Sequence, residues 1–301
     1  MNPLPPVTAT CMIRHGIRSP AVRAVGEIRS ARGALRCPVW LGMTSPPSEP
    51  VAADSVDARR RRRVAVVPAY NEETTVAAVL DGLYPLVDEL VVVDDGSTDR
   101  TRERIEAWLP GHPAARTLGF DKNQGMSAAY YHAFSDLRRR MAAGELSPDD
   151  FVFTVDADGQ HDLAAFDALQ DLADTEKLDA LIARRDLSDY PAIKRVGNWV
   201  LSAWASLWAG HRLHDVESGY RVFRLGALID ALDYYRGYRY SETVEVAVVL
   251  CRLGFRVRND VPVPVPVFRS RTRLVDAVID GAVIPAAAFR VFRRRRQQPA
   301  R

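Results

Sequence analysis

The chain has 301 residues, of which 47% are hydrophobic and 26% charged, which indicates a soluble globular protein with one large domain or two small ones. Residues 1–63 contain 11 Arg and 4 acidic residues, residues 286–301 contain 6 Arg and no acidic residue, and residues 64–285 contain 24 basic and 34 acidic residues. The acidic middle argues against a nucleic-acid-binding core. The basic ends suit nucleic acid or an anionic membrane surface.

The cysteines and the apolar runs of the sequence indicate the cellular compartment in which the protein works. Cys11, Cys37 and Cys251 are scattered without metal-ligand spacing, and their odd number favours a reducing compartment over a disulfide framework. The sequence contains no run of about 18 apolar residues, which argues against a transmembrane helix. No compact apolar segment of a signal peptide is recognisable near residue 1. We therefore expect a cytoplasmic protein.

Residues 1–63 show no sustained helical or strand period, and they end in an arginine run, Arg59 to Arg63. Scattered Pro, Ser and Arg predict a disordered or loosely ordered basic extension. An alternative hypothesis is that translation begins at Met43, which N-terminal sequencing of the native protein would decide. The arginine run is more typical of a solvated charge block than of a specific site.

From residue 64 onward, apolar strands alternate with helices. Continuous apolar runs such as Val64–Val67 are typical of strands buried in a parallel sheet. Strands are predicted at residues 64–67, 89–93, 115–120, 151–155 and 179–183, and an acidic turn, Asp94-Asp95, follows the second of them. This alternation predicts an α/β fold with a central, mostly parallel sheet flanked by helices. Ligands of such sheets bind at the carboxyl ends of the strands, where Asp95, Asp156 and Asp158 fall.

The next predicted helix, over about 193–209, carries Trp199, Trp204 and Trp208. Core packing is the interpretation we favour for these tryptophans, and an apolar groove for a lipid chain is the alternative. A polar turn that feeds a short strand, a helix opening at Ser241 and a proline-rich surface strand over 256–268 follow.

A candidate metal site follows the strand at 151–155, in the segment Asp156-Ala157-Asp158-Gly159-Gln160-His161. Alternate residues of an extended chain point the same way, so Asp156 and Asp158 can converge just past the strand, with Gln160 next in line. Two carboxylates and an amide oxygen are hard ligands suited to Mg²⁺ or Mn²⁺ that also binds a diphosphate. A solvated Asp-Gly turn is the alternative, and these residues alone favour neither interpretation.

Four motifs follow one another along the chain: Val66-Val67-Pro68-Ala69-Tyr70-Asn71-Glu72-Glu73, Val93-Asp94-Asp95-Gly96-Ser97-Thr98-Asp99, Asn123-Gln124-Gly125, and the Asp156–His161 segment. In order and spacing they resemble family 2 glycosyltransferases, most of all the dolichyl- or polyprenyl-phosphate sugar transferase branch. The resemblance implies a GT-A fold over residues 64–268. It also implies a UDP- or GDP-sugar donor and inversion at the anomeric carbon.

The resemblance further implies roles for single residues. A nucleotide pocket is expected to be lined by Pro68, Tyr70, Glu72, Val93, Asp95, Asp156 and Ala157. The Mg²⁺ or Mn²⁺ ion that bridges the diphosphate is expected on Asp156, Asp158 and Gln160. Arg185 is expected to face the phosphates, with Arg184 as the alternate. The acceptor phosphate is expected near Arg185, Ser218 and Arg221, the last two belonging to the motif Ser218-Gly219-Tyr220-Arg221.

The acceptor decides whether the chemistry needs a base. A departing β-phosphate needs its charge neutralised, which a divalent cation and an arginine supply. A lipid phosphate is already an anion, whereas a hydroxyl acceptor needs a carboxylate to take its proton. Glu242 and Glu245 are the candidate bases, followed by Asp215, and each is equally well explained as a capping or surface acid. We favour a polyprenyl-phosphate acceptor and leave a soluble hydroxyl acceptor open.

The segment Phe268–Arg273 departs from this branch, which usually has an Arg and then a Gly-x-Ser-Lys loop that closes over the substrate. Arg271 and Arg273 are candidate replacements for the lysine. Because of this departure, a non-catalytic module that binds a nucleotide sugar or a lipid phosphate stays an alternative. A nucleotidyltransferase is a weaker one, since the residues after the first strand, Pro68 to Asn71, are not a Gly-rich phosphate loop.

Residues 269–301 are expected to form an amphipathic helix, interrupted at Pro285, and a basic tail. Apolar residues repeat at helical spacing and arginines follow, namely Val275, Val278, Ile279, Ala282, Arg290 and Arg293–Arg296. This pattern predicts reversible peripheral contact with the cytoplasmic face of a membrane. A core helix with a solvated tail is an equal alternative, and Asp276 and Asp280, on or near the apolar side, weaken the membrane interpretation.

Overall fold

The computed structural model describes residues 61–237, 241–264 and 274–297. The expected N-terminal extension therefore lies outside the described residues as far as residue 60, and so does the Phe268–Arg273 segment. Of the described residues, Arg63 already begins the first strand, one residue before the expected boundary.

The described helices and strands, in chain order, are β1 (Arg63–Ala69), α1 (Val76–Leu83), β2 (Glu89–Asp95), α2 (Thr101–Trp108), β3 (Ala115–Phe120), α3 (Met126–Ala142), β4 (Phe151–Thr154), α4 (Phe166–Thr175), β5 (Ala180–Ile182), β6 (Arg184–Arg185), α5 (Ala192–Ala209), β7 (Arg221–Arg224), α6 (Leu225–Leu232), α7 (Glu242–Leu253), β8 (Val257–Arg258), β9 (Pro262–Val263) and α8 (Leu274–Gln297). Short 3-10 helices lie at Tyr84–Leu86, Leu109–Gly111 and Leu163–Ala165.

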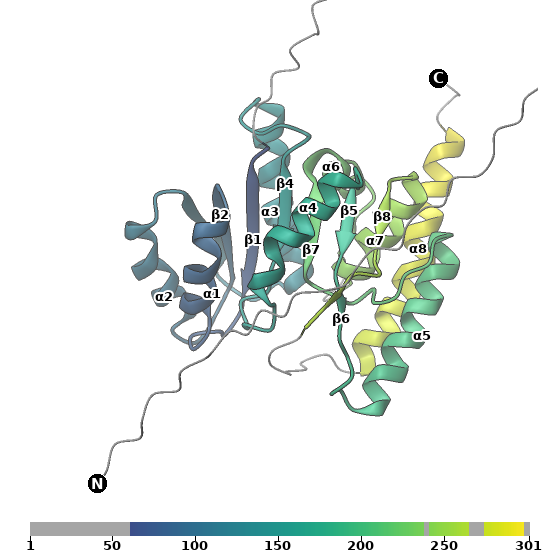
Figure 1. The fold of residues 1–301 in the computed structure, drawn as a ribbon, viewed down its shortest axis with the longest axis horizontal. Coiled ribbons are helices and arrows are strands. Elements are labelled where there is room, and N and C mark those ends of the chain that lie inside the picture. The colour runs from purple at the N-terminus through teal and green to yellow at the C-terminus, as the bar shows by residue number, and fades with distance from the viewer. Residues whose placement is uncertain (1–60, 238–240, 265–273, 298–301) are drawn as a thin grey trace, which may run out of the picture. The chain divides into compact units, whose positions relative to one another are not determined.

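Seven of the described strands form one sheet, in the order β3-β2-β1-β4-β7-β5-β8 (Figure 1). Strand β1 pairs in parallel with β2 and β4, β2 with β3, and β5 with β8. Strand β7 is antiparallel to both its neighbours, β4 and β5. The predicted α/β fold with a mostly parallel central sheet is therefore confirmed.

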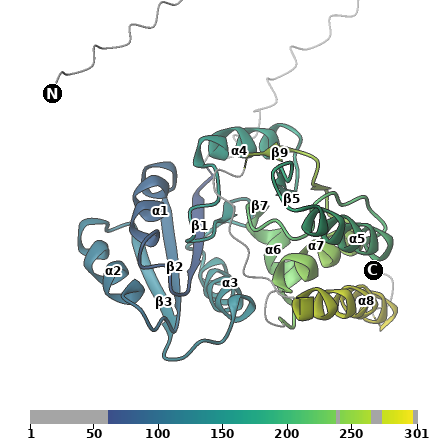
Figure 2. The ribbon, with the colours of Figure 1, turned by 90° about the horizontal axis from the view of Figure 1, so that it is seen from below.

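Both faces of the sheet are buried, which explains why its central strands are continuous apolar runs. Successive side chains of β1 point to opposite faces: Val64 and Val66 join one apolar core, and Ala65 and Val67 join the other. Helices α1, α2 and α4 cover the second core, whereas α3, α5, α6, α7 and α8 contribute to the first (Figure 2). Each fully buried valine contributes roughly 1.5–3 kcal/mol.

The predicted surface strand over 256–268 is shorter than expected. Its described part splits into β8, at one edge of the main sheet, and β9, which pairs with β6 in a separate two-stranded sheet. Prolines at positions 262 and 264 have no N–H to donate to a ladder, which limits the pairing of β9.

Helix α5 corrects our interpretation of two of its tryptophans as core residues and confirms it for the third, Trp208, which is partly buried against the first apolar core. Its buried side consists of Asn198, Leu201, Ser202, Ala205 and Ala209. Trp199 lies on the opposite side and is 69% exposed, and Trp204 is 39% exposed. The reason is that α5 stands at the end of the sheet, where it packs only on one side, against α7 and α8.

Helix α8 continues through Pro285 to Gln297, so the expected basic tail is helical over most of its length. Its buried side carries Asp276 and Asp280 together with Val283, Ile284, Ala287, Ala288 and Val291. Val278, which we expected on a membrane-facing stripe, is indeed 67% exposed. The two acidic residues therefore face the protein and do not interrupt the outward surface. No helix within the described ranges is both long enough and apolar enough to cross a membrane.

Candidate active site

A cavity of about 470 Å³ lies at the carboxyl ends of β1, β2 and β4. Most of the residues singled out from the sequence line it, namely Pro68, Tyr70, Glu72, Asp95, Asp156, Ala157, Asp158, Gln160, Arg185 and Ser218. Another set of the candidates does not line it, namely Val93, Arg184, Asp215, Arg221, Glu242 and Glu245. The residues expected to bind nucleotide, with the exception of Val93, thus come together with the expected metal ligands, whereas the candidate bases do not line the cavity.

Asp95, at the end of β2, organises the loop that precedes α3. Its carboxylate accepts hydrogen bonds from the backbone N–H groups of Gln124 (2.7 Å) and Gly125 (2.9 Å) and from the side-chain amide of Asn123 (3.1 Å). Burial raises the pKa of Asp95, and these hydrogen bonds oppose the rise. The two separate sequence motifs therefore form one wall of the cavity.

The first two motifs are also joined to each other. Asn71 adopts a left-handed backbone conformation (φ 55°) rather than capping α1, and its side-chain oxygen accepts a hydrogen bond from Thr98 N at 2.8 Å. Glu72 N donates to Thr101 Oγ1 at 2.7 Å. Because these bonds cross from the loop after β1 to the loop after β2, Tyr70 and Glu72 are held at the cavity wall.

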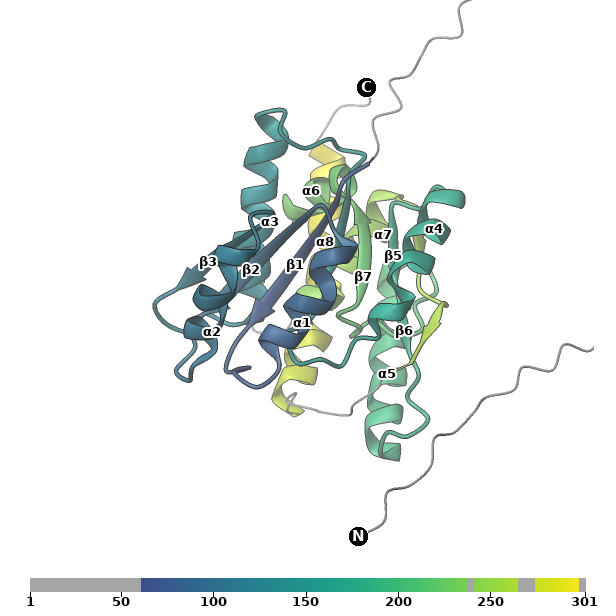
Figure 3. The ribbon, with the colours of Figure 1, turned by 60° about the vertical axis from the view of Figure 1, so that its left-hand side comes forward.

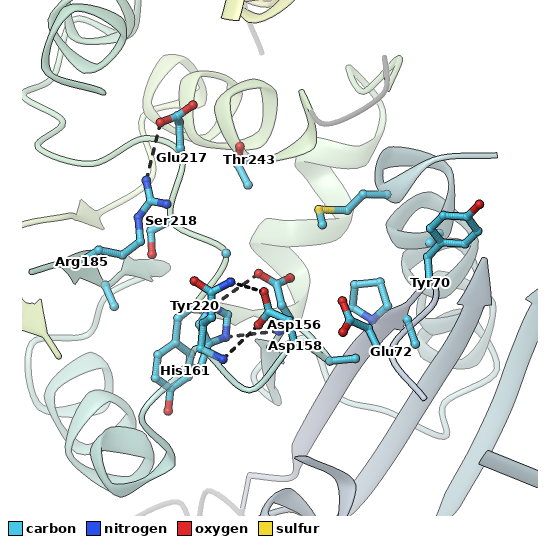
Figure 4. Close-up of a pocket in the computed structure, with 18 of the residues that line it drawn as sticks. Tyr70, Glu72, Asp156, Asp158, His161, Arg185, Glu217, Ser218, Tyr220 and Thr243 are labelled. Carbon is cyan, nitrogen blue, oxygen red and sulfur yellow. Dashed lines mark hydrogen bonds and ion pairs between the residues drawn. The ribbon is translucent and has the colours of Figure 1, made fainter. Parts of the chain in front are cut away.

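Asp156 and Asp158 lie between the side of the cavity that carries Tyr70 and Glu72 and the side that carries Arg185 (Figure 4). The Asp156 carboxylate accepts a hydrogen bond from Tyr130 Oη at 3.3 Å. Asp158 accepts hydrogen bonds from both the backbone and the side-chain N–H groups of Gln160, at 3.0 and 2.5 Å.

His161 is a site residue that our sequence reasoning left without a role. Its Nε2 lies 3.5 Å from the Asp156 carboxylate, its Nδ1 accepts from Asp156 N at 3.2 Å, and its ring stacks on Tyr220. Burial lowers the pKa of His161, although Asp156 opposes the shift. The signal was its place directly after the ligand candidate Gln160, but only the fold shows that the ring turns back toward the Asp156 carboxylate.

Gly219 leaves room for the Asp156 carboxylate. A Cβ at position 219 would lie 2.5 Å from Asp156 Oδ2, well inside van der Waals contact. The neighbouring Ser218 lines the cavity, and its buried Oγ has no hydrogen-bond partner among the described residues. The Ser-Gly pair therefore combines a close approach to one carboxylate with a hydroxyl that a ligand can satisfy.

The acidic segment fits a divalent cation that a ligand helps to hold. Among the described residues, no group of three or more His, Cys, Asp and Glu side chains could hold a metal ion by itself. Burial raises the pKa of Asp156, and the negative charge of Asp158 adds to the rise. A divalent cation relieves this repulsion, and two carboxylates with an amide oxygen form the oxygen-only donor set that Mg²⁺ or Mn²⁺ prefers when phosphate oxygens supply further ligands.

Arg185 lies across the cavity from this acidic segment and is held in a bidentate pair with Asp215 (2.8 Å for both bonds). Burial by itself would lower its pKa, but the Asp215 carboxylate outweighs that effect and raises it. Asp215 is 1% exposed and accepts from the Arg185 backbone as well. Asp215 therefore orients a permanent cation at the cavity wall and is not placed to act as a base.

Arg221 and Glu242 differ most from the roles we expected. They form a bidentate pair at 2.9 and 2.5 Å in which both residues are 0% exposed. The Arg221 guanidinium also lies over the rings of Tyr130 and Phe223. Neither residue lines the cavity, because the antiparallel strand β7 directs Arg221 into the core beneath it.

Glu245, the second candidate base, is likewise 0% exposed and absent from the cavity wall. Its carboxylate accepts hydrogen bonds from the backbone N–H groups of Arg236 and Gly237, at 2.9 Å each, and pairs with Arg290 of α8. This arrangement fastens α8 to the start of α7.

Three residues that the sequence did not suggest for the site complete the far end of the cavity: Lys194 on α5, Glu217 before β7 and Asp280 on α8. Glu217 lies 3.6 Å from Arg185, and burial raises its pKa. Burial, with the nearby Glu217 and Asp276 carboxylates, raises the pKa of Asp280 to about 7. No local motif marks these residues, since they come from three separate elements.

Comparison with known proteins agrees with the fold and identifies the family. The family model described as glycosyl transferase family 2 matches residues 64–230. An undecaprenyl-phosphate mannosyltransferase of Micrococcus luteus is 27% identical over 240 residues, which cover 77% of this chain and 93% of that protein. A UDP-N-acetylglucosamine–dolichyl-phosphate N-acetylglucosaminyltransferase of Methanococcus voltae is 27% identical over 218 residues, covering 66% and 83%.

Among solved structures, a glucosyl-3-phosphoglycerate synthase of Mycobacterium tuberculosis crystallised with Mn²⁺ and UDP-glucose superimposes with a TM-score of 0.55 and 20% identity, covering 77% of this chain and 80% of that one. This likeness supports the GT-A fold. The family match spans more than half of the chain and contains the Asp156–His161 segment and the Ser-Gly pair. The chain belongs to glycosyl transferase family 2.

Proposed function

We propose that this protein transfers a sugar from a UDP- or GDP-sugar to a polyprenyl phosphate, with a divalent cation assisting departure of the nucleotide. The observation that carries the proposal is the facing arrangement of Asp156 and Asp158 on one side of the cavity and Arg185 on the other. A diphosphate between them would meet positive charge from the bound cation and from the arginine, as a leaving nucleotide requires.

The chain's own residues would divide the work between donor and acceptor. Tyr70, Glu72 and the loop held by Asp95 line the side on which we place the nucleotide. Asp156, Asp158 and Gln160 would hold Mg²⁺ or Mn²⁺, which when bound neutralises charge on the departing diphosphate. Asp215 keeps the Arg185 guanidinium in place without further reorganisation.

The acceptor class rests on the cations and the unpaired hydroxyl at the far end. Arg185, Lys194 and the Ser218 hydroxyl all line the cavity there, as an anionic acceptor group requires. The two relatives described above are named for undecaprenyl- and dolichyl-phosphate acceptors. A lipid substrate places the protein in peripheral contact with a membrane, and its nucleotide-sugar donor places it on the cytoplasmic face.

A donor panel against undecaprenyl phosphate and several soluble acceptors tests this proposal, with released nucleotide as the readout. We expect sugar to partition into organic solvent with the lipid, and EDTA to abolish the release until Mg²⁺ or Mn²⁺ is restored. Activity that is indifferent to metal removal would contradict the metal's role. Nucleotide binding by calorimetry without release, across the whole panel, would instead favour the non-catalytic binding module.

A soluble hydroxyl acceptor is the second candidate, and one observation favours it. Asp280 and Glu217 both line the far end of the cavity, and the pKa of Asp280, at about 7, suits a general base. This candidate moves the role of base away from the buried Glu242 and Glu245. Efficient transfer to soluble hydroxyl acceptors alone, lost in Asp280→Asn, would replace the lipid phosphate.

A further inference from the structure

Most of the exposed large apolar side chains among the described residues lie on α5 and α8. On α5 it comprises Ile193 (78% exposed), Val196 (57%), Trp199 (69%), Val200 (53%), Trp204 (39%) and Leu207 (67%). On α8 it comprises Val278 (67%), Phe289 (60%) and Phe292 (51%). We call these nine residues the α5/α8 surface. Large apolar side chains gathered on one exposed surface are typical of an interaction site rather than of scattered surface residues.

The two helices form one continuous surface. They pack against each other at the end of the sheet, and Trp204 Nε1 donates a hydrogen bond to the Gly281 carbonyl of α8 at 2.9 Å. In α5 the exposed apolar residues recur at positions 193, 196, 200, 204 and 207, opposite the buried side at 198, 201, 205 and 209. This helix is therefore apolar on its outward side as well as on its inward side.

The exposed charged residues of α5 and α8 themselves all have the same sign, whereas Asp186 and Asp189, in the loop before α5, and Asp233, which pairs with Arg294, are the exposed acidic residues near them. Helix α5 contains no acidic residue, and its exposed charged residue is Arg195. In α8 both acidic residues, Asp276 and Asp280, are buried, whereas Arg293, Arg294 and Arg295 are exposed. A pair of helices that exposes tryptophan and other large apolar side chains, and whose own exposed charged residues are all arginines, matches the chemistry of an anionic membrane surface.

The same helices also border the cavity. Lys194 and Asn198, on the inward side of the first turns of α5, line it, and so does Asp280 of α8. In two views α5 continues past the carboxyl ends of the strands, where the cavity lies (Figures 1 and 3). A helix is about 10 Å across, so the outward apolar side and the cavity wall are separated by roughly that distance.

We propose that the α5/α8 surface binds the surface of an anionic lipid bilayer and so brings the far end of the cavity to the headgroup level. The biological purpose of this membrane contact rests on the proposed lipid-phosphate acceptor. Binding to a bilayer can nevertheless be tested without that acceptor. The isoprenoid chain of the acceptor stays in the bilayer, and its phosphate reaches Arg185 and Lys194 past the first turns of α5. Arg195 and the exposed arginines of α8 provide the attraction to anionic headgroups.

Flotation of the full-length chain with acceptor-free vesicles tests the surface independently of catalysis. We expect the chain to float with vesicles that contain 30% phosphatidylglycerol, and to float about tenfold less with pure phosphatidylcholine. For the variant Val196→Ser/Trp199→Ser/Leu207→Ser, the fraction of protein that floats with the anionic vesicles should be about tenfold lower than for the unmodified chain, or lower still. Tyr131→Ser, which removes a 49% exposed aromatic residue on α3, should float as the unmodified chain does.

A second measurement guards against misfolding of the triple variant. Its nucleotide release toward detergent-dispersed polyprenyl phosphate should stay within twofold of the unmodified chain, because none of the three residues lines the cavity. Its release toward the same acceptor embedded in vesicles should fall about tenfold. If the chain floats with vesicles but transfers sugar to no lipid acceptor, the α5/α8 surface is still supported as a membrane-binding surface and the proposed acceptor is rejected.

Two results would overturn the inference. One is equal flotation of the triple variant and the unmodified chain. The other is absence of flotation by the unmodified chain. Sedimentation would then show what covers the surface: a dimer that the triple variant dissociates would mean a second copy, and a monomer would mean another part of the chain.

Discussion

The two ends of the cavity, which we call the donor side (Tyr70, Glu72 and the loop held by Asp95) and the acceptor side (Lys194, Glu217 and Asp280) after the substrates proposed for them, are built in different ways. On the donor side, loops after β1, β2 and β3 are joined by short hydrogen bonds, such as those from Gln124 and Gly125 to Asp95. On the acceptor side, Lys194, Glu217 and Asp280 come from separate elements. The pKa values of Glu217 and Asp280 are raised by burial.

This difference matches the demands of the two substrates. A nucleoside diphosphate needs fixed dipoles and charges, and local turns that satisfy their own polar groups provide them without further reorganisation. An acceptor site made from distant elements can change by helix packing without disturbing the donor loops. Variants on the two sides should therefore separate into those that lose catalysis and those that mainly change stability or pH dependence.

The largest effect is expected for Asp158→Ala, on the donor side. Removing one of two convergent carboxylates should lower nucleotide release by about 10²–10³-fold at saturating Mg²⁺, because charge on the departing diphosphate is no longer neutralised in place. Asp149→Ala, which removes an exposed carboxylate before β4, is the matched control and should release nucleotide normally. A loss of less than tenfold in Asp158→Ala would remove the metal site from this segment.

Beneath the cavity, Glu242→Gln should lower the free energy of unfolding by about 3–5 kcal/mol, because it leaves the fully buried Arg221 guanidinium without its charge partner. Denaturant titration measures this loss. Glu103→Gln breaks an exposed ion pair with Arg100 and should leave the midpoint unchanged. Activity per folded molecule should remain in Glu242→Gln, and its disappearance in a stable variant would restore Glu242 as a catalytic candidate.

At the border between the two sides, Gly219→Ala should lower activity by about 10- to 100-fold. The added Cβ would lie 2.5 Å from Asp156 Oδ2 and displace that carboxylate, and small displacements at a reacting centre have effects of this size. A raised metal requirement for half-maximal activity should accompany the loss. Gly111→Ala, where a Cβ meets nothing within 4 Å, is the control. Unchanged activity in Gly219→Ala would show that Asp156 can move freely.

The smallest effect is expected for Asp280→Asn, on the acceptor side. The folded pKa of Asp280, about 7, lies above its ordinary value of 3.8, so the folded state binds more protons than the unfolded state between these values. Stability contributed by this group is therefore present at low pH and lost as pH rises through 7. Three pKa units correspond to roughly 4 kcal/mol. We expect about 1–2 kcal/mol, because the carboxyl borders an open cavity.

Thermal unfolding measured from pH 5 to pH 8 checks this expectation. Asp280→Asn should gain stability over the unmodified chain at pH 8 and little at pH 5. Asp233→Asn, which removes a partly exposed carboxylate paired with Arg138, should show no such pH dependence. An equal shift at both pH values would mean that Asp280 is not protonated in the folded state near neutral pH.

Much of the donor side could be predicted from local sequence. The apolar run Val64–Val67 predicted a buried strand, and this prediction is correct because both faces of the sheet are covered. The acidic segments that end β2 and follow β4 lie at the carboxyl ends of these strands, as expected. The four motifs are short, continuous and polar, so their spacing along the chain carries the information that places them at one edge of the sheet.

Tertiary structure alone decided the roles of the remaining polar residues. The sequence suggested functional roles for Arg221 and Glu242. In the structure, the antiparallel strand β7 turns Arg221 into the core, where it pairs with Glu242 in the first turn of α7. In the sequence, Asp280 was expected to interrupt the apolar side of a helix. In the structure, the packing of α8 on α5 and α7 turns this residue toward the cavity. Periodicity shows that a helix has two sides, but only its neighbours determine which side is buried, and for α5 and α8 those neighbours are far away in the sequence.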